Sequence, residues 1–469
     1  MSTTSSLAAV NPDTNPHLSG VFTPTTAEVE ADNLKVIGHL PVDLDGLYLR
    51  NGPNPRFTPL GSYVYPLEGD GMVHAVHIAE GRARYANRFV RTPALRHEEH
   101  VGHAIWPGLM TGYLPSVDEV GPFLANTARD TPCINLVRHG GRLLALAESD
   151  VPFRLTAQFD SVGRETFAGE LPAGITAHPK IDSVTGEMVV FCYQLEAPFL
   201  TWAVIDRSGT VTRPATPVAG VDRPTVIHDM ALTSRYLVLV LAPLTFDLSA
   251  AGNGGSPLRW GPRDGTRIAL IPRDGGPVRW ATTEAFWLWH TANAYDEEDR
   301  VVLDYVEWFR PGVEHGDTPV TGGLTRALIN PATCAVTRTR VDDRPIELPR
   351  IDDRLIGRPY HLVAVAGRAQ RTDLPPGAFD AVRCYDVTRG TFTQWDAGRL
   401  VVGEPVFVPH PAGTAGETGW WVTIGTDSDT MSSWFVVLPA DDLEAGPVAQ
   451  VRLPIRVPQG LHGIWVPTA

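Results

Sequence analysis

The chain has 469 residues, of which 43% are hydrophobic and 20% are charged, a composition typical of globular proteins and not of disordered ones. Its 53 acidic and 39 basic residues give a formal net charge of −14, and no block of Lys and Arg stands against the acidic excess. This balance argues against a nucleic-acid partner and against a general attraction to anionic lipid.

Cysteine usage and the chain start predict a cytoplasmic protein. The four cysteines are far apart and form no C-x-x-C pair, which indicates reduced thiols: Cys133, Cys192, Cys334 and Cys384. Residues 1–16 are small and polar, without a basic stretch or an apolar core, so no signal peptide is predicted. The longest strongly apolar run, residues 236–242, is too short to span a bilayer.

Turn residues dominate the organisation of the chain. Gly (44) and Pro (41) are plentiful without a period, which favours many short strands over long helices. Residues 1–20 read as a flexible N-terminal arm, and no linker divides residues 21–469, which are predicted to form one domain. Within it, residues 46–55 read as a strand that runs into a Gly/Pro turn, and residues 69–78 and 84–90 read as a hairpin.

Residues 91–130 are the least β-like part of the chain. His97, His100 and His103 are three residues apart, as on one helical face; a solvated helix face with Glu98 and Glu99 is favoured over a second metal site. The uncharged segment 105–114 has many large apolar residues. It is expected either to pack in the core under a loop or to form an exposed apolar lip for a lipophilic partner or for peripheral membrane contact.

From residue 141 onward one pattern recurs: an apolar strand, a turn close to Asp-x-x-Gly, and another strand. The turns include residues 160–163, 182–186, 206–209, 273–276, 330–333 and 386–390. Many antiparallel hairpins with almost no helical periodicity predict an all-β fold, either a β-propeller or a large sandwich. No repeat is clean enough to count blades.

Four histidines in distinctive strings favour the propeller. They are His178 in Thr-Ala-His-Pro, His228 in Ile-His-Asp-Met-Ala, His290 in Trp-His-Thr-Ala-Asn-Ala-Tyr, and His462 in Gly-Leu-His-Gly-Ile-Trp. Neutral imidazole is a common ligand of zinc, copper, iron and nickel, although one such histidine alone is more often structural. Residues from distant blades converge on the axis of a propeller, whereas a sandwich has no such point.

The four strings, in this order, resemble the metal-ligand segments of the carotenoid cleavage oxygenase family. The resemblance extends to residues 47–55, to Gly-Asp-Gly-Met-Val-His at 69–74, to Glu-Leu-Pro-Arg-Ile-Asp at 347–352 and to the tail 448–466. It runs from about residue 16 to the C-terminus. It implies a seven-bladed β-propeller with a cap of loops and short helices, and one Fe(II) on the axis held by His178, His228, His290 and His462.

The resemblance also implies the chemistry, since this family uses O2 to split a carbon–carbon double bond into two carbonyl products. Its substrates are carotenoids, apocarotenoids, stilbenes and phenylpropenoids, and one branch isomerises retinoid esters instead. Four neutral imidazoles would leave iron its full charge and two open positions in an octahedral field, which suits O2 chemistry. The residues alone do not separate iron from zinc, copper or nickel.

Three glutamates match the positions at which the family supports its metal-bound histidines. They are Glu148, Glu347 and Glu404, and each lies next to apolar residues, where an unpaired carboxylate would be costly. A metal-bound histidine usually donates its other N–H to a carboxylate or a carbonyl, although a structural salt bridge is the alternative role. By resemblance, His178 would be the histidine without a carboxylate partner.

Two departures from the family pattern bear on the substrate. Residues 65–68, Tyr-Pro-Leu-Glu, replace the His-Trp-Phe-Asp of many relatives. The stilbene-cleaving branch usually has a lysine directly before the first of these glutamates, and Ala147 stands there in this chain. The aromatic residues Phe286, Trp287 and Trp289 around the third histidine are expected either to line a substrate tunnel or to belong to the core.

These patterns predict an Fe(II)- and O2-dependent enzyme that cleaves a double bond of a lipophilic carotenoid or apocarotenoid. The same reaction on a stilbene or phenylpropenoid is the first alternative. A propeller metallohydrolase or isomerase is less favoured, because propeller hydrolases generally bind metal through carboxylates and amides and this chain offers four imidazoles. A metal-free interaction propeller with structural histidines is the remaining alternative.

Overall fold

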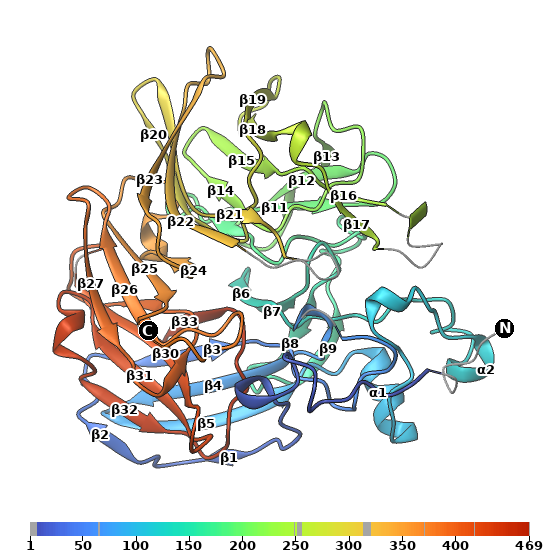
Figure 1. Ribbon diagram of the computed structural model, residues 1–469, viewed down its shortest axis with the longest axis vertical. Helices are drawn as coiled ribbons and strands as arrows, with labels where there is room; N and C mark the ends of the chain where they lie inside the picture. Colours follow the sequence, from blue (N-terminus) through green and yellow to red (C-terminus); the bar gives the residue numbers. More distant parts are fainter. Residues whose placement is uncertain are drawn as a thin grey trace.

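Seven antiparallel sheets follow one another around a ring, so the chain forms the seven-bladed β-propeller that was predicted (Figure 1). The computed structural model describes residues 7–63, 66–247, 249–250, 256–312, 320–369, 371–416 and 418–468. Residues 1–6 of the predicted arm and Tyr65 of the departure at 65–68 lie outside these ranges. In the described part of the arm, Leu18 is buried and the Val10 N–H donates to the Pro59 carbonyl.

The blades are four- to six-stranded. The first has the order β1–β5–β4–β3–β33, formed by β1 (Glu30–Ala31), β3 (Gly46–Arg50), β4 (Met72–Ala79), β5 (Arg82–Phe89) and β33 (Gly463–Pro467). The second and third consist of β6 (Asn135–His139), β7 (Arg142–Leu146), β8 (Phe153–Leu155), β9 (Ser161–Arg164), and of β10 (Lys180–Ile181), β11 (Met188–Tyr193), β12 (Leu200–Ile205), β13 (Val211–Pro217).

The remaining four blades continue this order around the ring. The fourth and fifth consist of β14 (Met230–Leu232), β15 (Tyr236–Leu241), β18 (Thr266–Pro272), β19 (Arg279–Thr283), and of β20 (Thr291–Glu297), β21 (Arg300–Arg310), β22 (Val320–Ile329), β23 (Val336–Asp342). The sixth consists of β24 (Ile346–Arg350), β25 (Leu362–Gly367), β26 (Ala381–Asp386) and β27 (Thr391–Asp396). The seventh consists of β2 (Val36–Gly38), β28 (Leu400–Val402), β29 (Val406–Pro409), β30 (Gly419–Asp427), β31 (Ser433–Pro439) and β32 (Ala449–Arg452). The hairpin β16 (Leu244–Phe246) and β17 (Leu258–Trp260) stands apart from the blades.

Both ends of the chain close the ring. The C-terminal strand β33 pairs with β3 of the first blade, with Arg50 opposite Gly463, and β2 near the N-terminus pairs with β32 of the seventh blade. The buried Arg50 adds a side-chain hydrogen bond to the Pro458 carbonyl at 2.6 Å. Each of these two blades therefore combines strands from both ends of the chain, and the pairing of β33 fixes the residues that precede it.

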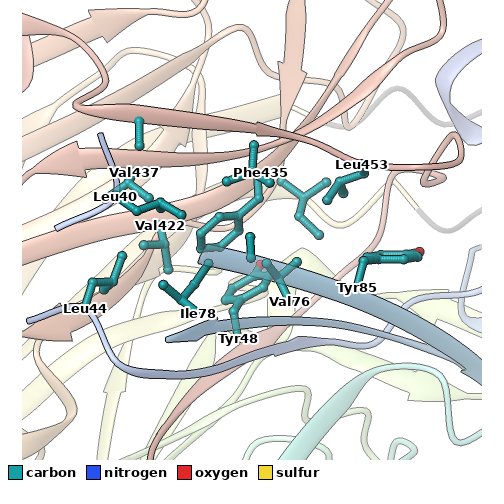
Figure 2. Packing of buried hydrophobic residues seen from close by; sticks show 14 of the residues in the cluster. Leu40, Leu44, Tyr48, Val76, Ile78, Tyr85, Val422, Phe435, Val437 and Leu453 are labelled. Carbon is teal, nitrogen blue, oxygen red and sulfur yellow. The ribbon is translucent and has the colours of Figure 1, made fainter. Parts of the chain in front are cut away.

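Hydrophobic side chains between neighbouring blades form the core. Figure 2 shows the cluster between the first and seventh blades, where Tyr48 of β3 packs on Phe435 of β31 with ring centroids 5.3 Å apart. Buried and more exposed residues alternate along β5, as expected of a strand with one face toward this cluster. Burying each large apolar side chain contributes about 1.5–3 kcal/mol, so the interblade clusters hold the ring together.

The segment between the first two blades contains helices α1 (Pro93–Val101) and α2 (Val117–Val120) and the 3-10 turn η4 (Leu109–Thr111). The other described 3-10 turns are η2 (Gly20–Phe22), η3 (Pro66–Glu68), η5 (Pro262–Asp264), η6 (Asp353–Leu355) and η7 (Leu443–Ala445). Helix α1 begins at the N-cap Thr92, which accepts the Leu95 N–H, and it ends at Gly102, whose φ of 84° a residue with a Cβ rarely adopts. The predicted cap of loops and short helices is therefore present.

The expectation of a solvated helix face is wrong for Glu98. Its side chain is 1% exposed, it accepts the backbone N–H groups of Ile105 and Trp106, and it pairs with Arg129. The loop after α1 folds back over the helix and supplies these donors, and no periodicity within the helix reveals that. His103 lies beyond the end of α1.

The apolar segment 105–114 is partly buried and partly exposed. Ile105 and Trp106 are buried against Ala94 and Val120, whereas Leu109 and Leu114 are 56% and 46% exposed. The side chain of Met110 lies outside the described residues. No helix in the described ranges has the length and apolar character that a bilayer crossing needs.

Candidate metal centre

The four predicted histidines occupy equivalent places in the propeller. Each lies at or just before the start of the inner strand of a blade: His178 before β10, His228 before β14, His290 before β20 and His462 before β33. These inner strands start at the same end of the ring, so their leading residues meet on its axis. One nitrogen of each ring lies within 4.8 Å of one nitrogen of every other.

The cluster is compact and buried. The Nε2 atoms of His178 and His228 are 3.1 Å apart, as are those of His290 and His462, and each of the four residues is 9% exposed or less. Within the described part of the chain, no other group of three or more His, Cys, Asp or Glu residues converges in this way. Among the described residues, His97, His100 and His103 form no such group, so the less favoured alternative of a second metal site gains no support.

Three glutamates accept hydrogen bonds from Nδ1, the nitrogen that faces away from the axis, of three of the rings. Nδ1 of His228 is 2.6 Å from Glu148, Nδ1 of His290 is 2.6 Å from Glu347, and Nδ1 of His462 is 2.9 Å from Glu404. A carboxylate only accepts, so each Nδ1 carries the proton and each Nε2 presents a lone pair to the axis. Among the described residues, the ring of His178 has no hydrogen bond to a carboxylate and lies against His228 instead.

Burial and neighbouring charges shift the pKa values of three of the histidines and of Glu404. Burial lowers the pKa of His178 well below its usual value, and it lowers the pKa of His462 to about 4 against the opposing effect of Glu404. Burial also acts to lower the pKa of His290, but Glu347 together with Asp229 and Glu404 outweighs burial, and the pKa is raised. Burial opposes ionisation of Glu404, yet Arg350 and His462 prevail and lower its pKa to about 2, so this carboxylate is charged near neutral pH.

The donor set fits a divalent transition-metal ion. Nε2 lone pairs from three oriented rings and the neutral His178 point at one buried place, an arrangement that is costly unless a cation satisfies them. Imidazole suits iron, copper, zinc and nickel, and the negative charges of three supporting carboxylates compensate a divalent ion.

A charged network that the sequence analysis missed ties the histidine strands together. Lys180 donates to Asp229 Oδ1 at 2.8 Å, and Thr291 donates through its backbone N–H and its hydroxyl to Asp229 Oδ2, both at 2.8 Å. Burial opposes ionisation of Asp229, but Lys180, His290 and the hydrogen bond from Thr291 together outweigh burial and lower the pKa of this carboxyl. Lys180 is one of only two lysines in the chain and Asp229 directly follows His228, a signal that could have pointed to this pair.

The cluster has different surroundings on its two sides. An axial cavity of about 500 Å³ between the inner strands reaches His178, His290 and His462, and the ion-paired Lys180 and Arg350 lie in its wall. On the other side the Trp289 ring lies 4.9 Å from the ring of His228 and belongs to an aromatic cluster.

The members of this aromatic cluster are Trp287, Tyr193, Phe246, Trp260, Trp289 and Trp308, together with smaller apolar residues. Of the three aromatic residues around His290, Phe286 stacks on Tyr305 in the core and Trp287 is 1% exposed, whereas Trp289 is partly exposed. The core interpretation therefore holds for the first two, and only Trp289 is exposed beside the histidines.

A propeller with four buried histidines on its axis, three of them backed by glutamates, defines a class of propeller with a candidate transition-metal site. Comparison with known proteins identifies the family. The family model described as "Retinal pigment epithelial membrane protein" matches residues 22–467. The "Carotenoid cleavage oxygenase" of Mycobacterium tuberculosis is 34% identical over 97% of this chain and 98% of its own length.

Two solved structures have the same fold. The lignostilbene dioxygenase of Pseudomonas brassicacearum has a TM-score of 0.88 at 28% identity, with 97% of this chain and 99% of that chain covered. Cobalt-substituted apocarotenoid oxygenase of Synechocystis has a TM-score of 0.84 at 28% identity, with 98% and 99% covered. The chain belongs to the carotenoid cleavage oxygenase family and is an enzyme of this dioxygenase family, so the alternative of an interaction propeller without catalytic activity is wrong.

Proposed function

We propose that this enzyme binds one Fe(II) per chain through His178, His228, His290 and His462 and uses O2 to cleave a carbon–carbon double bond of a carotenoid or apocarotenoid. Two carbonyl compounds are the products. The observation that carries the proposal is the convergence of four buried imidazoles, three of them fixed by Glu148, Glu347 and Glu404, in a member of this family. Residues 21–469 act as one catalytic domain in this proposal.

The chemistry divides between the metal and the protein. Iron held by His178, His228, His290 and His462 would supply the activation of O2. The protein aims the four rings at the axis, and the glutamates hold the proton of three rings on Nδ1. Insertion of the two oxygen atoms across a C=C bond, with scission into two carbonyls, consumes no proton, so the site needs no general acid.

An apolar substrate suits the surroundings of the cluster. Trp289 stands beside His228, and burying hydrocarbon against such rings contributes about 25 cal/mol per Å². Ala147 is buried directly before Glu148, where the stilbene-cleaving branch usually has a lysine for a phenol. The exposed Leu109 and Leu114, with Phe123 at 93% exposure, offer an apolar surface for contact with a membrane or micelle that holds the polyene.

One observation favours a second substrate class. The lignostilbene dioxygenase shares the fold at a TM-score of 0.88, and two aromatic rings of a stilbene also suit an aromatic cluster. A phenylpropenoid or stilbene cleaved by the same reaction is therefore the alternative.

Metal analysis and a product screen test the proposal together. We expect about one iron per chain in the purified protein, and loss of iron and turnover when any of the four histidines is replaced by Ala. His139→Ala serves as the control, because His139 is buried and its Nε2 donates to the Asp206 carbonyl, outside the cluster. Wild-type iron and turnover in two of the four variants would show that the ligand set is wrong.

The screen presents a carotenoid, an apocarotenal and a 4-hydroxystilbene under air, with 18O2 to follow both oxygen atoms into the products. Faster cleavage of the carotenoid or apocarotenal, with one labelled oxygen in each carbonyl, is the expected result. Rapid cleavage of the hydroxystilbene with no reaction of the polyenes would establish the alternative instead.

A further inference from the structure

The three glutamates that accept hydrogen bonds from the histidines differ in how many further hydrogen bonds fix their carboxylates. Glu404 accepts two bonds besides that of His462, from Arg350 Nη1 at 2.9 Å and from the Gly463 N–H at 2.8 Å. This carboxylate is 2% exposed, and the cation and the backbone donor leave it one orientation.

Glu347 is held in a similar way. Beside His290 it accepts the indole N–H of Trp308 at 2.8 Å and the N–H of Leu348 at 2.5 Å, and its side chain is 8% exposed. The loss of either donor would leave the other in place. The Glu347 carboxylate therefore keeps one hydrogen-bond donor besides His290 when either Trp308 or Leu348 stops donating.

Glu148 has only one anchor apart from its histidine. It lies in a turn after β7, its side chain is 14% exposed, and Oε2 takes the N–H of His228. Oε1 accepts the hydroxyl of Tyr193 at 2.6 Å, and across the described residues no other hydrogen bond reaches this carboxylate. The orientation of Glu148 therefore depends on a single neutral donor.

Tyr193 is well placed to fix that orientation. It is the last residue of β11 in the neighbouring blade, and its ring packs in the aromatic cluster, 5.9 Å from the ring of Phe246. The packing fixes the ring, so the hydroxyl at its tip is fixed too. A short bond from a fixed donor costs little further entropy when it orders a carboxylate on a turn.

We propose that Tyr193 is a positioning residue of the metal centre, which acts through Glu148 to keep the proton of His228 on Nδ1 and Nε2 aimed at the metal. The role rests on the proposed function. Without the hydroxyl, Glu148 rotates toward solvent, the N–H of His228 loses a steady acceptor, and the fourth imidazole binds metal less tightly.

The comparison of three conservative variants tests this role without substrate. Tyr193→Phe removes only the hydroxyl. Trp308→Phe removes the equivalent donor to Glu347, where the Leu348 N–H remains. Tyr360→Phe is the matched control, because Tyr360 donates at the same 2.6 Å to the buried carboxylate of Asp304, which contacts Arg326 and no histidine.

The probes are Fe²⁺ and Co²⁺ alone, titrated anaerobically in competition with a chromophoric chelator, with the visible absorption of bound Co²⁺ as the spectroscopic signature. We expect Tyr193→Phe to weaken binding by about 10-fold, the lower end of the usual effect of outer-sphere partners, and to alter the Co²⁺ spectrum. Trp308→Phe is expected to weaken binding less than Tyr193→Phe, and Tyr360→Phe is expected to bind both ions as the wild type does.

A double-mutant cycle shows whether Tyr193 acts through Glu148. In the Glu148→Ala background, Tyr193→Phe should weaken binding no further, because nothing remains to be positioned. Wild-type affinity of Tyr193→Phe, or an equal loss in the Glu148→Ala background, would overturn the role of Tyr193 alone. If the wild-type protein bound neither ion, the proposed function would fail, and this role with it.

Discussion

Replacing Arg129 by Met is predicted to destabilise the segment that carries α1. The Arg129 side chain is 11% exposed and bridges two buried carboxylates, Asp70 after the first Gly/Pro turn and Glu98 of α1. Burial opposes its charge, but the two carboxylates outweigh burial and raise its pKa, so the guanidinium stays ionised. The substitution keeps most of the side-chain volume and removes the charge.

The expected loss follows from what remains around the carboxylates. Breaking a buried ion pair costs about 3–5 kcal/mol, since one charge is left uncompensated. Glu98 keeps the N–H donors of Ile105 and Trp106, and Asp70 keeps that of Arg56, so we expect the lower value of about 3 kcal/mol. An unfolding entropy of about 2.1 cal/mol/K for each of 469 residues converts this into a Tm lower by about 3 °C.

Scanning calorimetry at neutral pH measures the shift, and hydrogen exchange over residues 90–134 shows where protection is lost. Arg399→Met is the control, because the pair of Arg399 with Asp429 is 69% and 55% exposed and should contribute at most about 1 kcal/mol. Adding Glu98→Gln to Arg129→Met should restore part of the stability, since an amide oxygen still accepts both N–H groups. An unchanged Tm for Arg129→Met, or a further loss in the double variant, would refute the reasoning.

Three further predictions concern the metal centre, the thiols and the apolar surface. Glu148→Gln, Glu347→Gln and Glu404→Gln should each lower iron affinity by about 10- to 100-fold in a chelator competition, with circular dichroism unchanged; wild-type affinity in all three would remove them from the site. Burial raises the pKa of Cys192 and Cys384 to about 12, and it raises that of Cys133 as well. At pH 8 a thiol reagent should therefore label only the half-buried Cys334 in the native protein and all four thiols in denaturant. Fast labelling of a second thiol in the native protein would contradict this. Leu109→Ser with Phe123→Ser should reduce cosedimentation with neutral liposomes and impair cleavage of a detergent-solubilised polyene more than that of a short soluble alkene, and equal effects on both substrates would exclude a role in extraction.

Local patterns in the sequence are enough to predict the strands and the candidate metal ligands. The hairpin predicted at residues 69–90 forms as β4 and β5, and its turn falls at Glu80 and Gly81, both with positive φ. The alternation of buried and exposed residues is a local property of a strand, so it can be recognised in a short stretch of consecutive residues. The four histidine strings likewise stand out because each has its own neighbours in sequence.

Contacts between segments far apart in sequence were open to inference only where a family resemblance pointed to them. Glu148, Glu347 and Glu404 were predicted on that basis, and each lies 57 to 80 residues from its histidine. Ala147 and the aromatic residues near His290 gave no comparable guide, and only packing showed that Phe286 is core while Trp289 contacts His228.

The tertiary structure alone decided the rest of the site. Tyr193 lies 45 residues from Glu148, Lys180 lies 49 residues from Asp229, and Arg129 lies 31 residues from Glu98. Apart from the rarity of Lys180 and the place of Asp229 beside His228, no local pattern marks these residues, and each pair meets because blades and cap loops pack against one another. The sequence by itself therefore determined which strands this protein forms and which histidines are its candidate ligands. The closure of the ring decided which side chains form hydrogen bonds with the glutamates and aspartates around those histidines. The physical reason is that a hydrogen bond between distant segments depends on the path of the whole backbone and not on the sequence neighbours of either residue.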